Sequence, residues 1–161
     1  ILAGIPAIVL VSRRKHFSSL SMLDLMAPAC MLGQAIGRWG NFMNREAYGS
    51  VTEVFCRMGL QMNNGEFVYV HPTFLYESLW NIIGFAFLSR FTAKGKRRYP
   101  GQCLLLYFLW YGCGRAWIEG LRTDSLLFFG TTLRVSQLLS IVLSLAAAIL
   151  LIKNRKYHET D

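Results

Sequence analysis

Several polar residues lie in one apolar stretch, at intervals that place them on one face of a helix. They stand at offsets of 0, 4, 8 and 11, which keeps them within roughly 80° at 3.6 residues per turn, and they are Tyr111, Arg115, Glu119 and Arg122. A fixed, partly desolvated arginine can stabilise a developing anion. The same spacing also fits a purely structural ladder, in which Glu119 pairs with Arg115 and Arg122. Spacing alone leaves both interpretations open.

A second polar group lies in the segment GRWGNFMNREAYG, residues 37–49, which holds three glycines, two asparagines, two arginines and one glutamate. Glycines there let a ligand or another helix approach the backbone closely. Arg38 offers a planar fork that suits phosphate, and Asn41 and Asn44 offer amide donors. These groups fit an anionic head group. In the alternative interpretation Arg38 only reaches to the membrane interface, and the glycines serve helix packing.

The composition indicates which elements position these residues. Of the 161 residues, 53% are hydrophobic and 16% are charged, whereas an ordinary soluble domain has roughly 25% charged residues. The apolar residues form long runs, which are typical of membrane-spanning helices of about 20 residues. We therefore predict an all-α, polytopic integral membrane protein. We expect a helical bundle with one longer extracytoplasmic loop segment, in a single transmembrane domain over residues 1–161.

The lengths of the apolar runs predict the positions of the helices. We expect a truncated helix at 1–12, whose start is missing, and helices at about 22–39, 72–91, 101–121 and 133–152. The outer segment 40–71 mixes glycine, asparagine, charged and aromatic residues, and we expect a short strand in it from Phe67 to Val70. Residues 153–161 are expected to form a cytoplasmic tail.

The basic residues predict the orientation of the bundle. Eleven of the 17 lysines and arginines form three clusters without an acidic residue, at 13–15, 90–98 and 153–156. If each helix reverses the chain direction, the clusters share one side, which the positive-inside rule identifies as cytoplasmic. Nucleic-acid binding needs one basic face interleaved with aromatic residues. Separate clusters do not provide it, so we expect no nucleic-acid partner.

Three more polar residues lie at helix starts or inside predicted helices. Asp24 follows Ser21 by three residues, a pattern that resembles a capping box for its own helix. Glu77 lies inside a membrane segment, where an ionisable group costs about 2.5–3.5 kcal/mol to insert and is a functional suspect. His71 precedes Pro72, which is typical of a helix start. The four cysteines form no CxxC pair, so we expect neither a metal site nor a cofactor.

Four segments of the chain resemble one family of bacterial membrane enzymes. They are GRWGNFMNREAYG at 37–49, HPTFLYES at 71–78, YGCGRAWIEGLRTD at 111–124 and SMLDLMAP at 21–28. Their residues and order resemble the prolipoprotein diacylglyceryl transferases, which attach lipid to lipoprotein precursors. Members of that family begin with additional membrane helices and carry a His-Gly-Gly segment, which this chain lacks. We therefore expect the chain to correspond to the C-terminal part of a member, and to lack part of the active site on its own.

The resemblance implies a reaction and its partners. The reaction is transfer of a diacylglyceryl group from phosphatidylglycerol to the thiol of a lipobox cysteine, the first step of bacterial lipoprotein maturation. The implied partners are phosphatidylglycerol, the prolipoprotein signal peptide and membrane lipids. The implied location is the bacterial cytoplasmic membrane, and no cofactor is implied.

The resemblance also implies roles for individual residues. The implied catalytic residues are Arg38, Arg115, Glu119 and His71. The implied substrate-binding residues are Arg38, Asn41, Asn44, Glu46, Gly49, Tyr111 and Arg122, with Asp24 and Glu77 as supporting residues. In this scheme the two arginines hold the lipid phosphate, Glu46 and Glu119 orient them, and His71 is the only base that this chain offers on the expected outer side.

Two other classes of membrane protein share some of these features. A transporter or channel fragment also places charged residues on one helix face, to line an ion path. That class would explain the polar residues on one helix face around Arg115, but not the glycine-rich segment. A phospholipid-synthesising phosphotransferase needs an Asp-rich, metal-binding helix, and Asp24 is the only aspartate in a predicted membrane helix.

Overall fold

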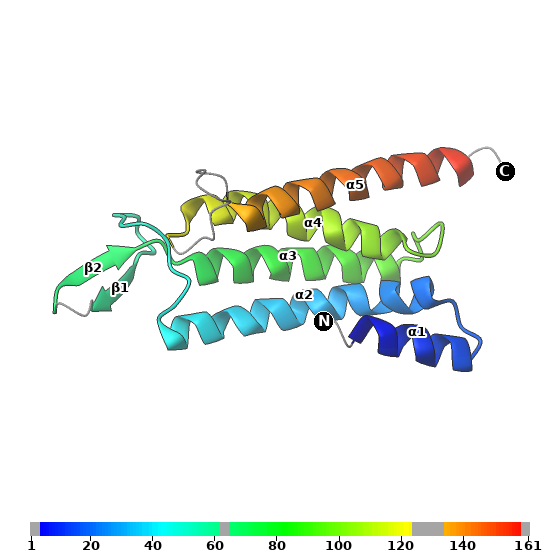
Figure 1. The fold of residues 1–161 in the computed structure, drawn as a ribbon, viewed down its shortest axis with the longest axis horizontal. Helices are drawn as coiled ribbons and strands as arrows, with labels where there is room; N and C mark the ends of the chain where they lie inside the picture. Colours follow the sequence, from blue (N-terminus) through cyan, green and yellow to red (C-terminus); the bar gives the residue numbers. More distant parts are fainter. Residues whose placement is uncertain (1–3, 62–64, 124–133, 159–161) are drawn as a thin grey trace.

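The computed structural model describes residues 4–61, 65–123 and 134–158, and most of them are helical (Figure 1). Long helices lie side by side in a bundle, and they are α2 (Ser19–Asn44), α3 (Thr73–Ala93), α4 (Gln102–Ile118) and α5 (Val135–His158). Three smaller elements accompany them: α1 (Gly4–Arg14) beside α2, the 3-10 helix η1 (Glu119–Leu121) after α4, and a hairpin of β1 (Met58–Gln61) and β2 (Phe67–Val70).

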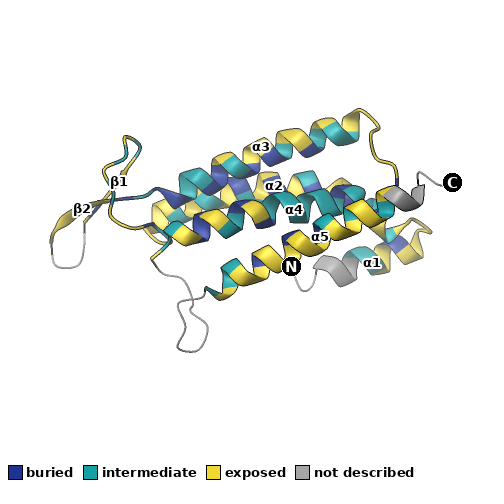
Figure 2. Ribbon diagram, turned by 90° about the horizontal axis from the view of Figure 1, so that it is seen from above, coloured by how far each residue is buried: buried dark blue, intermediate teal, exposed yellow. Residues whose placement is uncertain are grey.

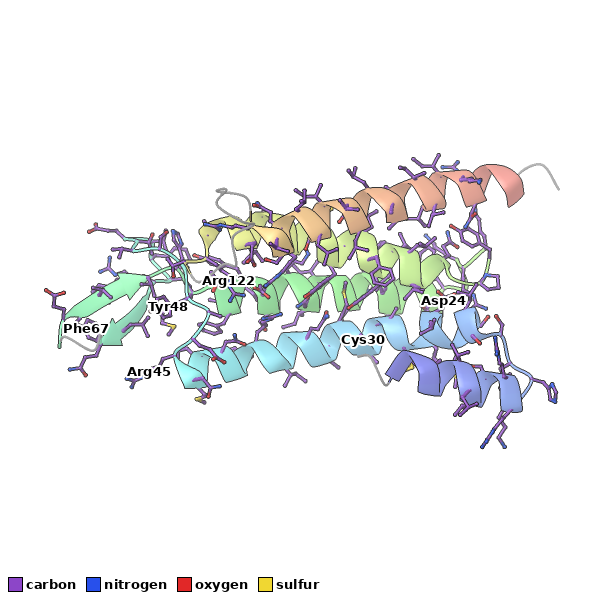
Figure 3. All side chains as sticks on the ribbon, viewed as in Figure 1. Asp24, Cys30, Arg45, Tyr48, Phe67 and Arg122 are labelled. Carbon is purple, nitrogen blue, oxygen red and sulfur yellow. The ribbon has the colours of Figure 1, made fainter. Side chains whose placement is uncertain are left out.

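The bundle has two different ends. The hairpin end holds β1 and β2, the C-terminal ends of α2 and α4, and the N-terminal ends of α3 and α5. The basic end holds the α1–α2 connection, the α3–α4 connection and the C-terminal end of α5. The basic clusters at 13–15, 90–98 and 153–156 therefore all lie at the basic end. In Figure 3, Asp24 lies at this end, and Tyr48 and Arg122 lie at the other.

Helix α2 is longer than its apolar run predicts. Ser18 is its N-cap, and the Ser18 hydroxyl accepts a hydrogen bond from the Ser21 amide at 3.4 Å. Asp24 lies inside the helix and is buried, so Ser21 and Asp24 do not form the predicted capping box. The helix ends where Arg45 adopts a left-handed conformation, with φ at 55°.

The C-terminal helix also extends beyond its apolar run. Residues 153–158, which we expected to begin a tail, continue α5 as far as His158. Lysine and arginine are good helix formers, so a run of basic residues ends the apolar stretch without ending the helix. The expected start at residue 133 and the last three residues of the chain lie outside the described residues.

The outer segment 40–71 contains more regular structure than we expected. The strand expected at Phe67 to Val70 is present as β2, and it pairs antiparallel with β1, in a register that sets Met58 opposite Val70. The alternating burial of β1 places Met58 and Leu60 in a small apolar cluster with Val70. Only two apolar residues mark this strand, which is too short a pattern to distinguish a strand from a loop.

Within the described residues, two helices have the length and apolar character needed to cross a membrane. They are α2, and the stretch Val135–Arg155 of α5. Only 22% and 17% of their most apolar windows are buried inside the structure, whereas the core helix of a soluble protein is buried on most sides. Figure 2 shows the exposed surface along α5, which includes Leu139, Leu145 and Ile149. These exposed apolar surfaces are suited to contact with lipid.

The interior of the bundle packs through small residues and aromatic rings. The indoles of Trp80 and Trp110 stack at 4.9 Å, and each Nε1 donates to the main-chain oxygen of the other residue, at 2.9 and 3.0 Å. Gly84 and Gly114 make room for this pair, because a Cβ at either position would overlap one of the indoles. The paired tryptophans fix α3 against α4, and this contact sets the distance between the charged residues described next.

Candidate functional site

A buried carboxylate on α3 joins arginines from two other helices. The Glu77 side chain is 6% exposed, and its Oε2 lies 2.7 Å from Arg38 Nε, while its Oε1 lies 2.8 Å from Arg115 Nη1. The contacts arise because α2 and α4 both pack on α3. Glu77 therefore holds the two predicted phosphate-binding arginines at fixed positions at the hairpin end of the bundle.

The ion pairs continue from Arg115 towards the last helix. Arg115 Nη2 lies 2.9 Å from Oε2 of Glu119, one turn further along the chain, and Glu119 Oε1 accepts a hydrogen bond from the Ser136 hydroxyl at 2.6 Å. The sequence Arg38, Glu77, Arg115, Glu119, which we call the ion chain, thus crosses α2, α3 and the end of α4 and is fixed to α5. Its two cations and two anions balance in charge, which offsets the cost of removing them from water.

Arg115 combines a contact along its own helix with a contact to another helix. The pair of Arg115 with Glu119 has the spacing of a structural ladder. However, Arg115 also reaches Glu77 on another helix, which a ladder along one helix does not do. Likewise, Arg38 turns towards Glu77 and is 21% exposed at its side chain, so its Nε is held inside the bundle. The geometry thus combines a pair along one helix with ion pairs between helices, and the charges of the four residues balance.

The two arginines differ in which guanidinium nitrogens already contact a carboxylate. Both Nη atoms of Arg115 face carboxylates. Arg38 is bound through Nε, and no described residue accepts a hydrogen bond from its Nη atoms. A guanidinium held by one nitrogen can still offer a second edge to an anion. Arg38 is therefore the residue with a fork available for a phosphate.

Two hydrogen bonds between α2 and α3 connect the residues next to Arg38 and Glu77. The next residue, Trp39, donates from Nε1 to the hydroxyl of Ser78 at 3.2 Å, and Ser78 donates to the carbonyl of Ala35 at 3.0 Å. Ser78 follows Glu77 directly and is buried. Sequence reasoning missed Ser78, because its partners lie on a helix some 40 residues away in the chain.

A small cavity adjoins the ion chain. It has a volume of about 10 Å³, and Glu77, Tyr111 and Arg115 line it together with Asn81. Asn81 is 2% exposed, and its Oδ1 has no hydrogen-bond partner among the described residues. A buried, unpaired amide oxygen costs about 1–3 kcal/mol. Sequence reasoning missed Asn81, although its position four residues after Glu77 on an apolar helix was a usable signal.

Three residues of the glycine-rich segment lie at the surface near Arg38. Asn41 is half-buried one turn after Arg38, and its carbonyl accepts a hydrogen bond from the Glu46 amide at 3.0 Å. Asn44 donates from Nδ2 to Glu46 Oε1 at 3.1 Å, and both are exposed. Among the described residues Glu46 forms no ion pair with either arginine of the ion chain. The carboxylate that contacts both arginines is Glu77, which the resemblance implied only as a supporting residue.

Gly49 lies where three segments of the chain meet. Its amide donates to the carbonyl of His71 at 3.0 Å, it forms a β-bridge with Arg122, and the next amide, of Ser50, donates to Leu121 at 3.0 Å. A Cβ at Gly49 would lie 2.6 Å from His71 Cβ and 2.9 Å from Leu121 O, so no larger residue fits. Gly49 thus positions the main chain at two predicted site residues, His71 and Arg122.

His71 lies at the hairpin end with a different set of neighbours. Its Nδ1 lies 3.2 Å from the hydroxyl of Tyr76, and that hydroxyl lies 3.6 Å from the thiol of Cys56. These three residues are half-buried. In the described part of the chain, no hydrogen bond or ion pair joins the His71 ring to the ion chain.

Asp24 lies far from these residues, at the basic end. Its Oδ2 accepts hydrogen bonds from the Gly101 amide at 2.7 Å and from Arg97 at 3.3 Å, and its Oδ1 accepts one from the Leu104 amide at 2.8 Å. A carboxylate that accepts from the first amides of a helix acts as a cap. Asp24 therefore caps α4, which is not the helix that contains it.

Comparison with known proteins places these residues in a family. The family model described as "Prolipoprotein diacylglyceryl transferase" matches residues 1–153. A protein of Streptococcus pneumoniae (strain Hungary19A-6), named phosphatidylglycerol–prolipoprotein diacylglyceryl transferase, is 43% identical over 160 residues, which are 97% of this chain and 60% of the relative. A Streptococcus suis (strain 05ZYH33) protein of the same name is 41% identical over 159 residues, 97% of this chain and 59% of the relative. The chain thus spans about 60% of the length of these curated relatives.

Proposed function

Because the chain belongs to the prolipoprotein diacylglyceryl transferase family, we propose that it forms part of an enzyme that transfers a diacylglyceryl group from phosphatidylglycerol to a prolipoprotein. The acceptor is the thiol of the lipobox cysteine, and the other product is glycerol phosphate. The substrates follow from the names of the relatives. The observation that carries the proposal is Arg38, whose Nε is held by a buried Glu77 and whose Nη atoms are available to a phosphate.

The chemistry requires anion stabilisation and a base. The sulfur attacks as a thiolate, and a free thiol has a pKa of about 8.5, so its proton must pass to a base. As the new carbon–sulfur bond forms, the carbon–oxygen bond to the phosphate breaks and the phosphate gains negative charge. Fixed cations in a site with little water stabilise that charge without reorganising. The ion chain supplies two such cations.

We propose that Arg38 and Asn41 hold the lipid phosphate, with Arg115 as the second cation. Glu77 and Glu119 act as positioning residues, because Glu77 holds both arginines and Glu119 holds Arg115, through contacts of 2.7–2.9 Å. The remaining proposed substrate contacts are Asn44, Glu46, Gly49, Tyr111 and Arg122. Tyr111 supports this role by lining the cavity beside Arg115, and the main chain at Gly49 and Arg122 closes the same end of the bundle.

We propose His71 as the base that this part of the enzyme contributes. Its Nδ1 faces Tyr76, so Nε2 is the atom available to accept a proton. Asp24 has no part in the proposed chemistry and supports the fold at the basic end.

We propose that α2, α3, α4 and α5 all cross the cytoplasmic membrane, with the basic end inside the cell. The exposed apolar surfaces of α2 and α5 support this placement. The gathering of the three basic clusters at one end supports the orientation, because lysine and arginine are enriched in cytoplasmic loops. This placement sets the ion chain towards the outer side, where a prolipoprotein signal peptide presents its lipobox.

The test is lipid transfer by the full-length protein in detergent, with radiolabelled phosphatidylglycerol and a lipobox peptide. We expect the parent protein to transfer label to the peptide thiol. Arg38→Lys keeps the charge but loses the planar fork, and we expect it to lower transfer at least 10²-fold. Arg45→Lys, at the exposed end of the same helix, is the matched control and should keep parental activity. A parent protein that moves ions but transfers no lipid would refute the proposal and favour a transporter.

A further inference from the structure

A large cavity lies at the basic end, far from the ion chain. Its volume is about 750 Å³, and it opens between the α3–α4 connection and the C-terminal half of α5. Lys96, Arg97, Arg98 and Arg155 line it, and no acidic side chain of the described residues does so. Arg115 and Gln102 are separated by 13 residues of α4, which is about 20 Å along a helix. The cavity is therefore separate from the proposed transfer site.

The walls of this cavity are held in place by specific contacts. Asp24 fixes the α3–α4 connection through Arg97 and the Gly101 amide, and Gln102 Oε1 accepts from the Arg98 amide at 2.7 Å. Tyr99, which also lines the cavity, is buried. Burial raises the pKa of the Tyr99 phenol, so the phenol stays neutral at physiological pH. The cavity is thus formed before any ligand arrives.

The lining of the cavity changes from charged to apolar along the bundle. The cationic side chains come from the connection and from the end of α5, whereas Leu106 of α4 and Leu151 of α5 lie further inside. A soluble phosphate would use only the charged part. A phospholipid matches both parts, because its phosphate meets the cations and its acyl chains meet the leucines.

We propose that this cavity binds an anionic phospholipid of the cytoplasmic leaflet, separately from the lipid that reacts at the ion chain. The proposal rests on the membrane placement given above. Basic pockets between membrane helices on the cytoplasmic side are suited to lipid phosphates. The bound lipid bridges the α3–α4 connection and α5, which both line the cavity.

The experiment locates the lipid by photo-crosslinking. The full-length protein in detergent is incubated with phosphatidylglycerol that carries a diazirine near the ester, irradiated and digested, and the modified peptides are identified by mass spectrometry. We expect adducts on residues 91–106 and 148–155. Lys96→Gln, Arg98→Gln and Arg155→Gln combined should weaken labelling there at least 10-fold, because each cation near the surface adds to the attraction.

A matched control removes three other cations from the same end. Arg13→Gln, Arg14→Gln and Lys15→Gln combined change the net charge equally but lie outside the cavity, and should leave the adducts within twofold. Unlabelled phosphatidylglycerol should compete, whereas phosphatidylcholine and inorganic phosphate at the same concentration should not. Adducts that survive the first triple change, or that inorganic phosphate removes, would overturn the proposal.

The outcome is distinguishable from failure of the proposed function. Arg38→Ala should abolish transfer and leave the adducts at the basic end unchanged. If the parent protein transferred no lipid, the proposed function would fail, and the adducts at the basic end would still decide whether the cavity binds a lipid.

Discussion

Asp24 and Glu77 are both buried carboxylates, yet they bind different kinds of partner at opposite ends of the bundle. Asp24 directs its oxygens to two main-chain amides at the start of α4 and to one arginine. Glu77 directs each oxygen to an arginine side chain on a different helix. Their side chains are 2% and 6% exposed, so burial does not distinguish them.

The difference between these carboxylates teaches how a buried charge can be assigned a role. Main-chain amides are present in every helix, so a carboxylate that binds them contributes to the fold. Arginine side chains are costly to bury without a partner, so the role proposed for a carboxylate that binds two of them is to hold those cations for the reaction. The first arrangement predicts an effect on stability, and the second predicts an effect on the reaction as well.

Removal of Glu77 should have the largest effect. Glu77→Ala leaves Arg38 and Arg115 without their shared partner, and breaking a buried ion pair costs about 3–5 kcal/mol. We expect that loss in unfolding measurements and no measurable lipid transfer. Leu79→Ala on the same helix, at a position that is half exposed, is the control. A stable, active Glu77→Ala protein would show that the ion chain is dispensable.

Replacement of Arg115 should separate charge from geometry. Arg115→Lys keeps a cation but cannot contact Glu77 and Glu119 together, since lysine lacks the planar fork. We expect turnover to fall about 10²- to 10³-fold, by analogy with the loss of one donor to a developing anion. Arg90→Lys, at the basic end of α3, should leave turnover unchanged. Full activity of Arg115→Lys would support the structural ladder.

Asp24→Asn should show the opposite pattern. Asparagine keeps one oxygen for the α4 amides but loses the charge, and loss of a helix cap costs about 0.5–2 kcal/mol. We expect the free energy of unfolding to fall by about that amount, while turnover per folded molecule changes less than threefold. A fall in turnover as large as that of Arg115→Lys would remove the distinction between the two carboxylates.

Asn81→Leu should have the smallest effect on stability, and it should raise the free energy of unfolding instead of lowering it. Leucine has a similar volume and leaves no unpaired oxygen beside Glu77, so we expect the protein to gain about 1 kcal/mol of stability. If Asn81 also serves the reaction, turnover should fall about tenfold at the same time. If stability increased and turnover stayed the same, Asn81 would contribute neither to packing nor to catalysis. A kinetic assay beside a thermal unfolding curve measures both.

The sequence predicted those parts of the site that depend on local spacing. The contact of Arg115 with Glu119 follows from their separation of four residues, and the positions of Tyr111 and Arg38 follow from their motifs. The partner of Arg38 could not be predicted, because Glu77 reaches it across two helices 39 residues apart. Asp24 was expected to cap its own helix, because its spacing from Ser21 suggests a partner in the same helix and does not reveal one on α4. Strand β1 was missed because it offers only Met58 and Leu60 as a pattern.

The contacts that close the two ends of the bundle join residues that are made several seconds apart during synthesis. Thr123 donates to the carbonyl of Tyr48, 75 residues away, and Leu104 donates to Asp24, 80 residues away. A ribosome that adds about 5–20 residues per second needs about 4–16 s to make such a span. Helix α3 is made within that interval, so Glu77 meets Arg38 before Arg115 has been made. Leu104, at the start of α4, then closes the basic end, and Thr123, after α4 and η1, closes the hairpin end, so both closures wait for this part of the chain.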